Sequence, residues 1–242
     1  MRLQARRGVD WALEGSGRLH LSVLCLLLEV SLVISQCPWL KEVSELDGAC
    51  VCALNVRNQL SIQCTAVDFA LLMTVLQQWD SAPPLSLLYV KNTTITTLKE
   101  NVFHGLTIEK LQVSWCGLHS ISGGAFSGLE EALANLNLQG NSLEAVPTAA
   151  LTRLHNLHSL DLSGNLLTSV PDDAFKGLHL SILKLAHNPL SLAPRSLAGL
   201  DTSLRSLSLR NTQQDTLPRA ILALSALTFL DLAHNTITSL QA

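Results

Sequence analysis

Four cysteines near the beginning of the chain are the side chains whose spacing is most specific for chemistry. Cys37, Cys50, Cys52 and Cys64 lie in the segment CPWLKEVSELDGACVCALNVRNQLSIQC. Such a cluster can bind zinc, form disulfides or pack as reduced thiols. Zinc sites usually pair cysteines across two to four residues, whereas one residue separates Cys50 from Cys52, which strains chelation of a single ion. We therefore expect two disulfides, and the sequence alone allows three pairings.

The other reactive residues lack the arrangement that catalysis or metal binding requires. His155 and His158 are three residues apart, but they precede a predicted strand, so we interpret them as solvated surface. We interpret the adjacent pairs Glu130–Glu131 and Asp172–Asp173 as solubilising charges, because neighbours in sequence do not necessarily converge on one substrate. The chain contains no P-loop, G-x-S-x-G or HExxH motif. We expect no enzyme, no metal site and no cofactor.

The composition favours one leucine-rich core and argues against a strongly charged partner. At 242 residues the chain can form one sizeable domain or two small ones. Apolar residues make up 48% and aromatic residues only 4%, so the core must consist mainly of aliphatic side chains. The net charge of −3 gives no electrostatic reason to expect nucleic acid or an anionic membrane surface as partner.

The first 35 residues have the pattern of a secretory signal. Four arginines precede the apolar run LSVLCLLLEVSLVIS, which spans residues 21–35 and is shorter than the roughly 20 residues that a membrane-spanning helix needs. Small residues near its end predict cleavage near Ser35–Gln36. The long basic region and Glu29 are atypical, and an uncleaved signal anchor is the alternative. We expect residues 1–35 to be a signal peptide and the product to be secreted or to lie on the extracellular face of the plasma membrane.

One pattern recurs from residue 85 to residue 242. The segment LHSLDLSGNLLTSVPDDAFKGL gives L-x-x-L-x-L-x-x-N-x-L, in which the ninth residue is polar. The ninth positions of seven units are Thr93, Cys116, Asn141, Asn165, Asn188, Thr212 and Asn235. Their spacings are 23, 25, 24, 23, 24 and 23 residues, and the fourth and sixth positions are always aliphatic. Ten residues after the ninth position come large apolar residues, namely Phe103, Phe126, Leu151, Phe175 and Leu222, and in the fifth unit this position shifts to Leu197.

This period and pattern resemble the leucine-rich repeat. One unit cannot bury its own apolar edge, so units must stack. The resemblance implies an α/β solenoid, a curved horseshoe with a parallel β-sheet on the concave face and a mostly irregular convex side. We divide the chain into a signal peptide (1–35), a cysteine-rich cap (36–84) and seven repeats (85–242), of which the last is incomplete.

The ninth residues are predicted to be structural. An Asn side chain both donates and accepts hydrogen bonds, so stacked amides can satisfy the backbone of adjacent coils. We call these seven residues the ladder. Thr93, Cys116 and Thr212 are weaker substitutes, so we expect a thinner ladder there. This position also favours a structural role for Cys116 over that of a reactive thiol.

The cysteine cluster resembles the N-terminal cap of extracellular leucine-rich-repeat proteins. The resemblance implies the pairs Cys37–Cys52 and Cys50–Cys64. Twelve residues separate the first two cysteines, which departs from the usual cap. The segment VDFALLMTVLQQW has apolar residues at helical spacing and predicts a short helix against the first repeat.

The outward strand positions form a mixed polar face that we predict to bind a partner. Its candidate contact residues are Tyr89, Lys91, Lys110, Gln112, Trp115, Asn137, Asp161, Lys184, Arg210 and Asp231. Trp115 is the best aromatic anchor, although it can equally pack on its neighbours. Asn92-Thr93-Thr94 is a glycosylation sequon, and a glycan on Asn92 would shield that end of the concave face.

The function expected from these features is non-catalytic protein binding outside the cell. The gaps between repeats follow the series 2, 4, 3, 2, 4, 3, which indicates a duplicated block of three repeats. Together with CVCALNVRNQLSIQC, this period resembles arthropod Artichoke and chaoptin-type proteins and implies cell adhesion or matrix organisation. The alternatives are a ligand-binding ectodomain of a Toll-like or growth-factor receptor and a small secreted decoy that dimerises.

The expected partner is another extracellular protein or a matrix component, including a second copy of the chain, and not nucleic acid. The sequence stops within the seventh repeat, which we interpret as a fragment. Membrane attachment would then need a C-terminal anchor beyond residue 242.

Overall fold

The computed structural model describes residues 34–35, 37, 39, 43, 45–46, 48–79 and 83–239. The predicted signal peptide, apart from the backbone of Ile34 and Ser35, lies outside the described residues. The chain divides into two units, and the described residues belong to the second, Ile34–Ala242.

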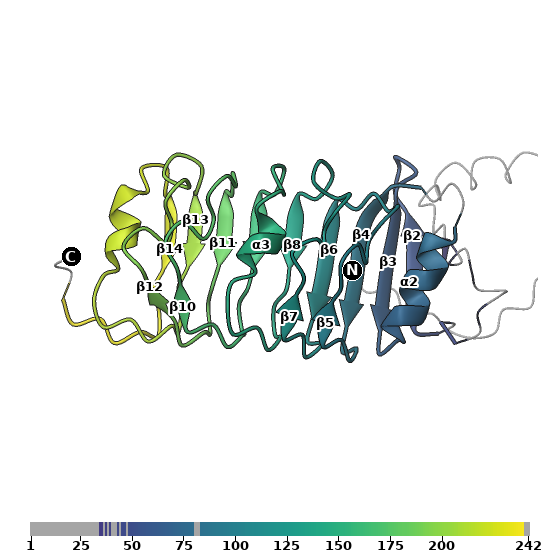
Figure 1. Ribbon diagram of the computed structural model, residues 1–242, viewed down its shortest axis with the longest axis horizontal. Helices are drawn as coiled ribbons and strands as arrows, with labels where there is room; N and C mark the ends of the chain where they lie inside the picture. Colours follow the sequence, from purple (N-terminus) through teal and green to yellow (C-terminus); the bar gives the residue numbers. More distant parts are fainter. Residues whose placement is uncertain are drawn as a thin grey trace, which may run out of the picture. The chain divides into compact units, whose positions relative to one another are not determined.

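A ten-stranded sheet lines one side of this unit (Figure 1). In spatial order its strands are β1 (Ile34–Ser35), β2 (Cys50–Leu54), β3 (Leu60–Thr65), β4 (Leu85–Lys91), β6 (Lys110–Ser114), β8 (Asn135–Asn137), β9 (Ser159–Asp161), β11 (Ile182–Lys184), β13 (Ser206–Ser208) and β14 (Phe229–Asp231). β1, β2 and β3 pair antiparallel, and every later pairing in this sheet is parallel. The expected fold, a leucine-rich-repeat solenoid with a long, mostly parallel sheet and few helices, is confirmed.

The leucines at the fourth position of each repeat hold these strands in register. They are the in-register partners Leu88, Leu111, Leu136, Leu160, Leu183, Leu207 and Leu230. All but the last are at most 1% exposed. Because side chains alternate between the two faces of a strand, the residues between the leucines face outward. Full burial of one such leucine contributes roughly 1.5–3 kcal/mol, and a one-residue slip would turn the whole row outward.

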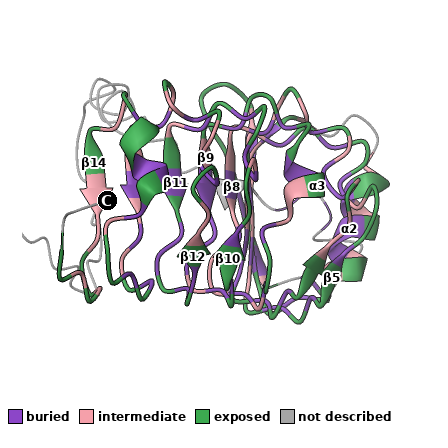
Figure 2. Cartoon of the chain, turned by 60° about the vertical axis from the view of Figure 1, so that its left-hand side comes forward, coloured by how far each residue is buried: buried purple, intermediate pink, exposed green. Residues whose placement is uncertain are grey.

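The chain returns from each strand through short, mostly irregular segments. They contain the parallel pairs β5 (Thr97–Leu98) with β7 (Ser120–Ile121) and β10 (Ser169–Val170) with β12 (Ser191–Leu192), the helix α3 (Thr148–Leu151) and the 3₁₀ helix η1 (Arg219–Ala223). The interior of every coil except the last is buried, whereas the turns are largely exposed (Figure 2).

Large apolar residues of the return segments fill the interior. Phe103, Phe126 and Phe175 are buried, and the rings of Phe103 and Phe126 stack with centroids 6.1 Å apart. Leu222, which the repeat pattern places at the equivalent position, is instead 65% exposed. Its neighbour Ile221 is buried, because successive residues of the 3₁₀ helix η1 point in directions about 120° apart.

The cap combines disulfides, strands and one helix. Disulfides join Cys37 to Cys52 and Cys50 to Cys64. The expected helix is present as α2 (Phe69–Gln77), which buries Leu72, Met73 and Leu76. Asp68 caps it by accepting a hydrogen bond from the N–H of Leu71 at 3.0 Å, and Phe69 packs edge-on against Phe103 of the first repeat.

The cap also extends the sheet, which the sequence analysis did not predict. β3 runs parallel to β4, and β2 runs antiparallel to β3. The period-two alternation of LSIQCT, with Leu60, Ile62 and Cys64 buried, is the sequence signal that indicates β3.

Candidate protein-binding face

The outward side chains of the parallel strands form continuous rows across the sheet. We use "strand face" for the outward side chains of β4, β6, β8, β9, β11, β13 and β14 and of the two residues that follow each strand; it is the predicted concave face. Its central row consists of the in-register residues Tyr89, Gln112, Asn137, Asp161, Lys184, Ser208 and Asp231. Parallel strands lie about 4.8 Å apart, so neighbours in this row can contact a single partner together.

The predicted contact residues differ in their exposure. Lys110, Trp115 and Lys184 are exposed, whereas Tyr89, Lys91, Gln112, Asn137, Arg210 and Asp231 are half-buried. Asp161, predicted as a surface contact, is only 8% exposed, because Lys184 of the next coil lies over it. The distance from Lys184 Nζ to Asp161 Oδ2 is 3.4 Å. Asp161 therefore contributes to the face mainly by holding Lys184.

Three residues of the central row also stabilise the end of their own strand. Oδ1 of Asn137, Asp161 and Asp231 each accepts a hydrogen bond from the backbone N–H two residues later, at 2.9–3.0 Å. These N–H groups lie just beyond the part of the strand that pairs with its neighbour. The side-chain oxygen therefore takes the place of a backbone acceptor on the neighbouring strand. The face thus combines fixed acidic and amide groups with cations that point to solvent.

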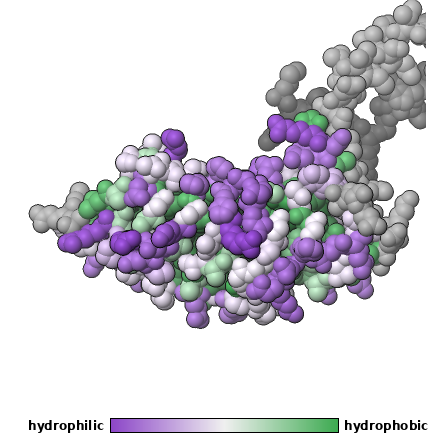
Figure 3. Space-filling model, turned by 45° about the horizontal axis from the view of Figure 1, so that its top comes forward, coloured by the Kyte–Doolittle hydropathy of each residue, from purple (hydrophilic) through white to green (hydrophobic). Residues whose placement is uncertain are grey.

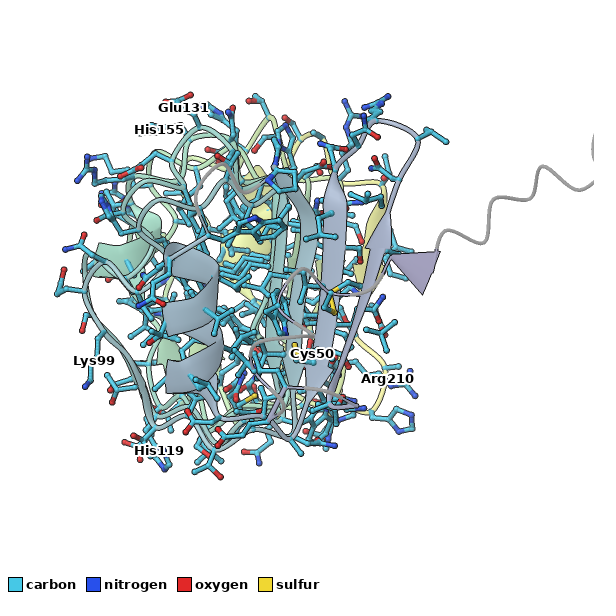
Figure 4. All side chains as sticks on the ribbon, turned by 90° about the vertical axis from the view of Figure 1, so that its right-hand side faces the viewer. Cys50, Lys99, His119, Glu131, His155 and Arg210 are labelled. Carbon is cyan, nitrogen blue, oxygen red and sulfur yellow. A yellow bond between two sulfur atoms is a disulfide. The ribbon has the colours of Figure 1, made fainter. Side chains whose placement is uncertain are left out.

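The cations and polar groups surround a shallow hollow. The hollow of about 300 Å³ is lined by Lys110, Gln112, Asn137, Asp161 and Lys184, among other strand residues. Figure 4 shows Arg210 on the strand side of the unit and Lys99 on the opposite side, near α2. The surface seen in Figure 3 is mostly hydrophilic or neutral, with scattered apolar residues.

The residue before each ladder position adopts a left-handed backbone conformation. In chain order these residues are Asn92, Trp115, Gly140, Gly164, His187, Asn211 and His234, with φ between 51° and 69°. Glycine and asparagine tolerate this conformation and histidine is enriched in it, whereas other bulky residues adopt it rarely. Trp115 is the exception that the repeat pattern does not explain, and its side chain is 54% exposed.

Trp115 lies against a glycine of the next coil. A Cβ atom built on Gly140 would be 2.5 Å from the Trp115 ring, so the glycine leaves the room that the ring occupies. The two residues are 25 positions apart, and the backbone N–H of Trp115 donates to the carbonyl of Gln139. The indole therefore has a defined place at the edge of the strand face.

The ladder asparagines connect adjacent coils through both ends of the amide. Nδ2 of Asn165 donates to the carbonyls of Leu162 at 2.9 Å and Leu138 at 3.1 Å, and its Oδ1 accepts from the N–H of Leu143. Asn141, Asn188 and Asn235 repeat this arrangement. Each amide thus bonds its own coil and the preceding one.

The three substitutes bond differently. Cys116 has no acceptor oxygen in its side chain, so the N–H of Ile95 donates to the Cys116 carbonyl instead. Burial raises the pKa of the Cys116 thiol, which keeps it protonated and a poor nucleophile. The Thr93 hydroxyl accepts from the N–H of Val67, and the Thr212 hydroxyl donates to the Leu209 carbonyl.

The histidines and paired acidic residues weighed as catalytic or metal-binding candidates lie on the surface. His155 and His158 are exposed, and Figure 4 places His155 and Glu131 at an edge of the unit. Glu130 pairs with Arg153 at 3.4 Å, and Asp173 pairs with Arg195 at 3.2 Å. Among the described residues, no group of three or more His, Cys, Asp or Glu side chains could hold a metal ion.

Comparison with known proteins agrees with this geometry. A family model described as leucine rich repeat matches residues 131–190, which include β8, β9 and β11. Comparison with curated proteins gave no match. Proteins of this repeat family are typically non-catalytic and bind other proteins.

The disulfides indicate an oxidising, extracellular setting. None of the helices in the described residues has the length and apolar content needed to cross a membrane. The chain contains leucine-rich repeats stacked along a mostly parallel sheet, and its disulfide-bonded N-terminal cysteines are consistent with a cap.

Proposed function

We propose that this protein is a non-catalytic extracellular binding module that contributes to cell adhesion or matrix organisation through its strand face. The observation that carries the proposal is the exposed cationic part of that face. Lys110 and Lys184 are exposed beside the hollow, and Arg210 lies farther along the same side. The resemblance to Artichoke and chaoptin-type proteins supports the adhesive role.

The charges of the face favour a partner whose contact surface is acidic. Its carboxylates, Asp161 and Asp231, are tied to Lys184, to Ser208 and to backbone N–H groups. Lys110 forms no ion pair among the described residues. The face therefore offers positive charge although the chain as a whole carries −3. Complementary charge speeds association and selects partners.

Binding by the full chain should depend on the strand-face cations. We expect beads coated with the secreted protein to bind cultured cells or their deposited matrix. The double variant Lys110→Glu/Arg210→Glu should bind about tenfold more weakly, which corresponds to ~1.4 kcal/mol. Lys184 is left unchanged because a glutamate there would face the buried Asp161.

The control is Lys176→Glu, which reverses one charge, as each substitution of the double variant does, at an exposed turn of a return segment. It should bind like the wild type, and thermal unfolding should show that all variants fold. Undiminished binding of the double variant, or an equal loss in Lys176→Glu, would contradict the assignment to the strand face.

A further inference from the structure

The first repeat exposes both functional residues of the sequon while anchoring the residue between them. Asn92 and Thr94 are exposed, and neither side chain forms a hydrogen bond within the described residues. Thr93 is only 3% exposed, and its hydroxyl is engaged by the N–H of Val67 and by the carbonyl of Lys91. The role of Thr93 in the ladder therefore fixes the turn that presents Asn92 and Thr94 to solvent.

Two hollows border the sequon. One, of about 660 Å³, lies beside the start of α2 and is lined by Asp68, Asn92, Thr94 and Lys99, among others. The second, of about 440 Å³, is lined by Asn92, Thr94, Trp115 and His119, among others. The second hollow, which we call the Trp115 hollow, places an exposed aromatic ring beside a free amide.

The Trp115 hollow has the chemistry to hold sugar. One side of the indole lies on Gly140, yet the side chain remains 54% exposed. An exposed indole offers an apolar face together with a polar N–H, and pyranose rings present apolar C–H faces between their hydroxyl groups. The turn before every ladder residue has this left-handed backbone, and Trp115 is the largest residue that adopts it there.

We propose that Asn92 carries an N-linked glycan whose core sugars pack in the Trp115 hollow against the indole. In the transfer, Asn92 Nδ2 attacks C1 of an oligosaccharide carried on a polyisoprenyl diphosphate. A C–N bond forms, the bond from C1 to the diphosphate oxygen breaks, Nδ2 loses a proton, and the polyisoprenyl diphosphate leaves. The proposal rests on the proposed extracellular function, because this transfer occurs in the secretory pathway.

The glycan would also define where a partner docks. It would screen the edge of the face at the first and second repeats, where Asn92 and Trp115 lie. Contacts with a partner would then concentrate on the rest of the face, which carries Lys184, Arg210 and, at the opposite end of β6 from Trp115, Lys110.

Glycan attachment is tested by mass spectrometry of the full chain secreted from animal cells. Wild type and Thr94→Ser should lose the mass of one glycan on treatment with peptide N-glycosidase, with Asn92 converted to Asp. Asn92→Gln and Thr94→Ala should be unchanged by the enzyme. A secreted wild-type protein without a glycan on Asn92 would overturn the proposal.

The contact with Trp115 is tested by the effect of the glycan on Tm in matched variants. Enzymatic removal of the glycan should lower the Tm of the wild type by about 2–4 °C, and should change it little in Trp115→Ala. Gly140→Ala should behave like Trp115→Ala, because the new methyl group displaces the ring. Gly164→Ala imposes similar backbone strain without touching the ring, and should keep the wild-type effect.

An equal effect of deglycosylation in wild type and Trp115→Ala would overturn the packing of the sugars on the indole. These measurements use no binding partner. A negative result here can therefore be told apart from a negative result in the binding experiment with Lys110→Glu/Arg210→Glu.

Discussion

Replacing Asn165 by alanine should lower the free energy of unfolding by about 2–4 kcal/mol. The side chain is 3% exposed and connects two coils through bonds to Leu138, Leu143 and Leu162. The carbonyls of Leu138 and Leu162 keep a second donor, from Asn141 and Asn188 respectively. The N–H of Leu143 loses its side-chain acceptor, and a buried donor without a partner costs about 1–3 kcal/mol. The lost bonds and the small cavity account for the remainder.

Urea unfolding of the full chain measures this effect. Asn156→Ala is the matched control, because it removes an exposed amide that donates to the Glu131 carbonyl. The control should lose no more than about 1 kcal/mol. Equal unfolding midpoints for Asn165→Ala and wild type would show that the ladder does not stabilise the stacked coils.

Removing the cap disulfides should have a comparable or larger effect. The bridges close loops with sequence separations of 15 and 14 residues, and each should stabilise the native state by about 3 kcal/mol. Cys50 and Cys64 are also register partners in β2 and β3, so their loss loosens the strand that pairs with β4. The variant Cys50→Ser/Cys64→Ser should unfold at lower urea concentration, and the variant without both bridges at a still lower one.

Reduction of the wild type should reproduce the disulfide-free variant. Hydrogen exchange should accelerate first in β3 and β4, because β3 belongs to the loosened hairpin and β4 pairs with β3. Thiol labelling of the unreduced, secreted protein should leave all four cap cysteines unmodified. Labelling of these cysteines, or an unchanged urea midpoint after reduction, would contradict a stabilising role for the bridges.

The repeat core could be predicted because its determinants are local and recur. The spacing of Leu136 and Leu138 around Asn141 specifies a short strand and a turn within one unit, and the same spacing in the next unit specifies its neighbour. The helix α2 was also predictable, since its own apolar spacing and the Asp68 cap define it. Exposure of Leu222 was missed because the 3₁₀ geometry of η1 shifts the buried position by one residue.

The details of the face depend on contacts between coils, which the pattern does not encode. Asp161 is covered by Lys184 from 23 residues later, and Trp115 lies on Gly140 from 25 residues later. Each residue of these pairs is acceptable at its position without the other. The register of β9 with β11 places Lys184 beside Asp161. The register of β6 with β8 places the turn that contains Trp115 beside the turn that contains Gly140.

Lysine labelling of the bound protein tests the role of the strand face most directly. The full chain would be labelled with an acylating reagent while bound to cells or matrix, and again free in solution. Lys91, Lys110 and Lys184 lie on the strand face, whereas the exposed Lys99 and Lys176 lie on return segments and serve as internal controls. We expect binding to protect Lys110 and Lys184 and to leave Lys99 and Lys176 reactive. Protection of Lys99 and Lys176, with Lys110 and Lys184 still labelled, would place the binding surface elsewhere on the molecule.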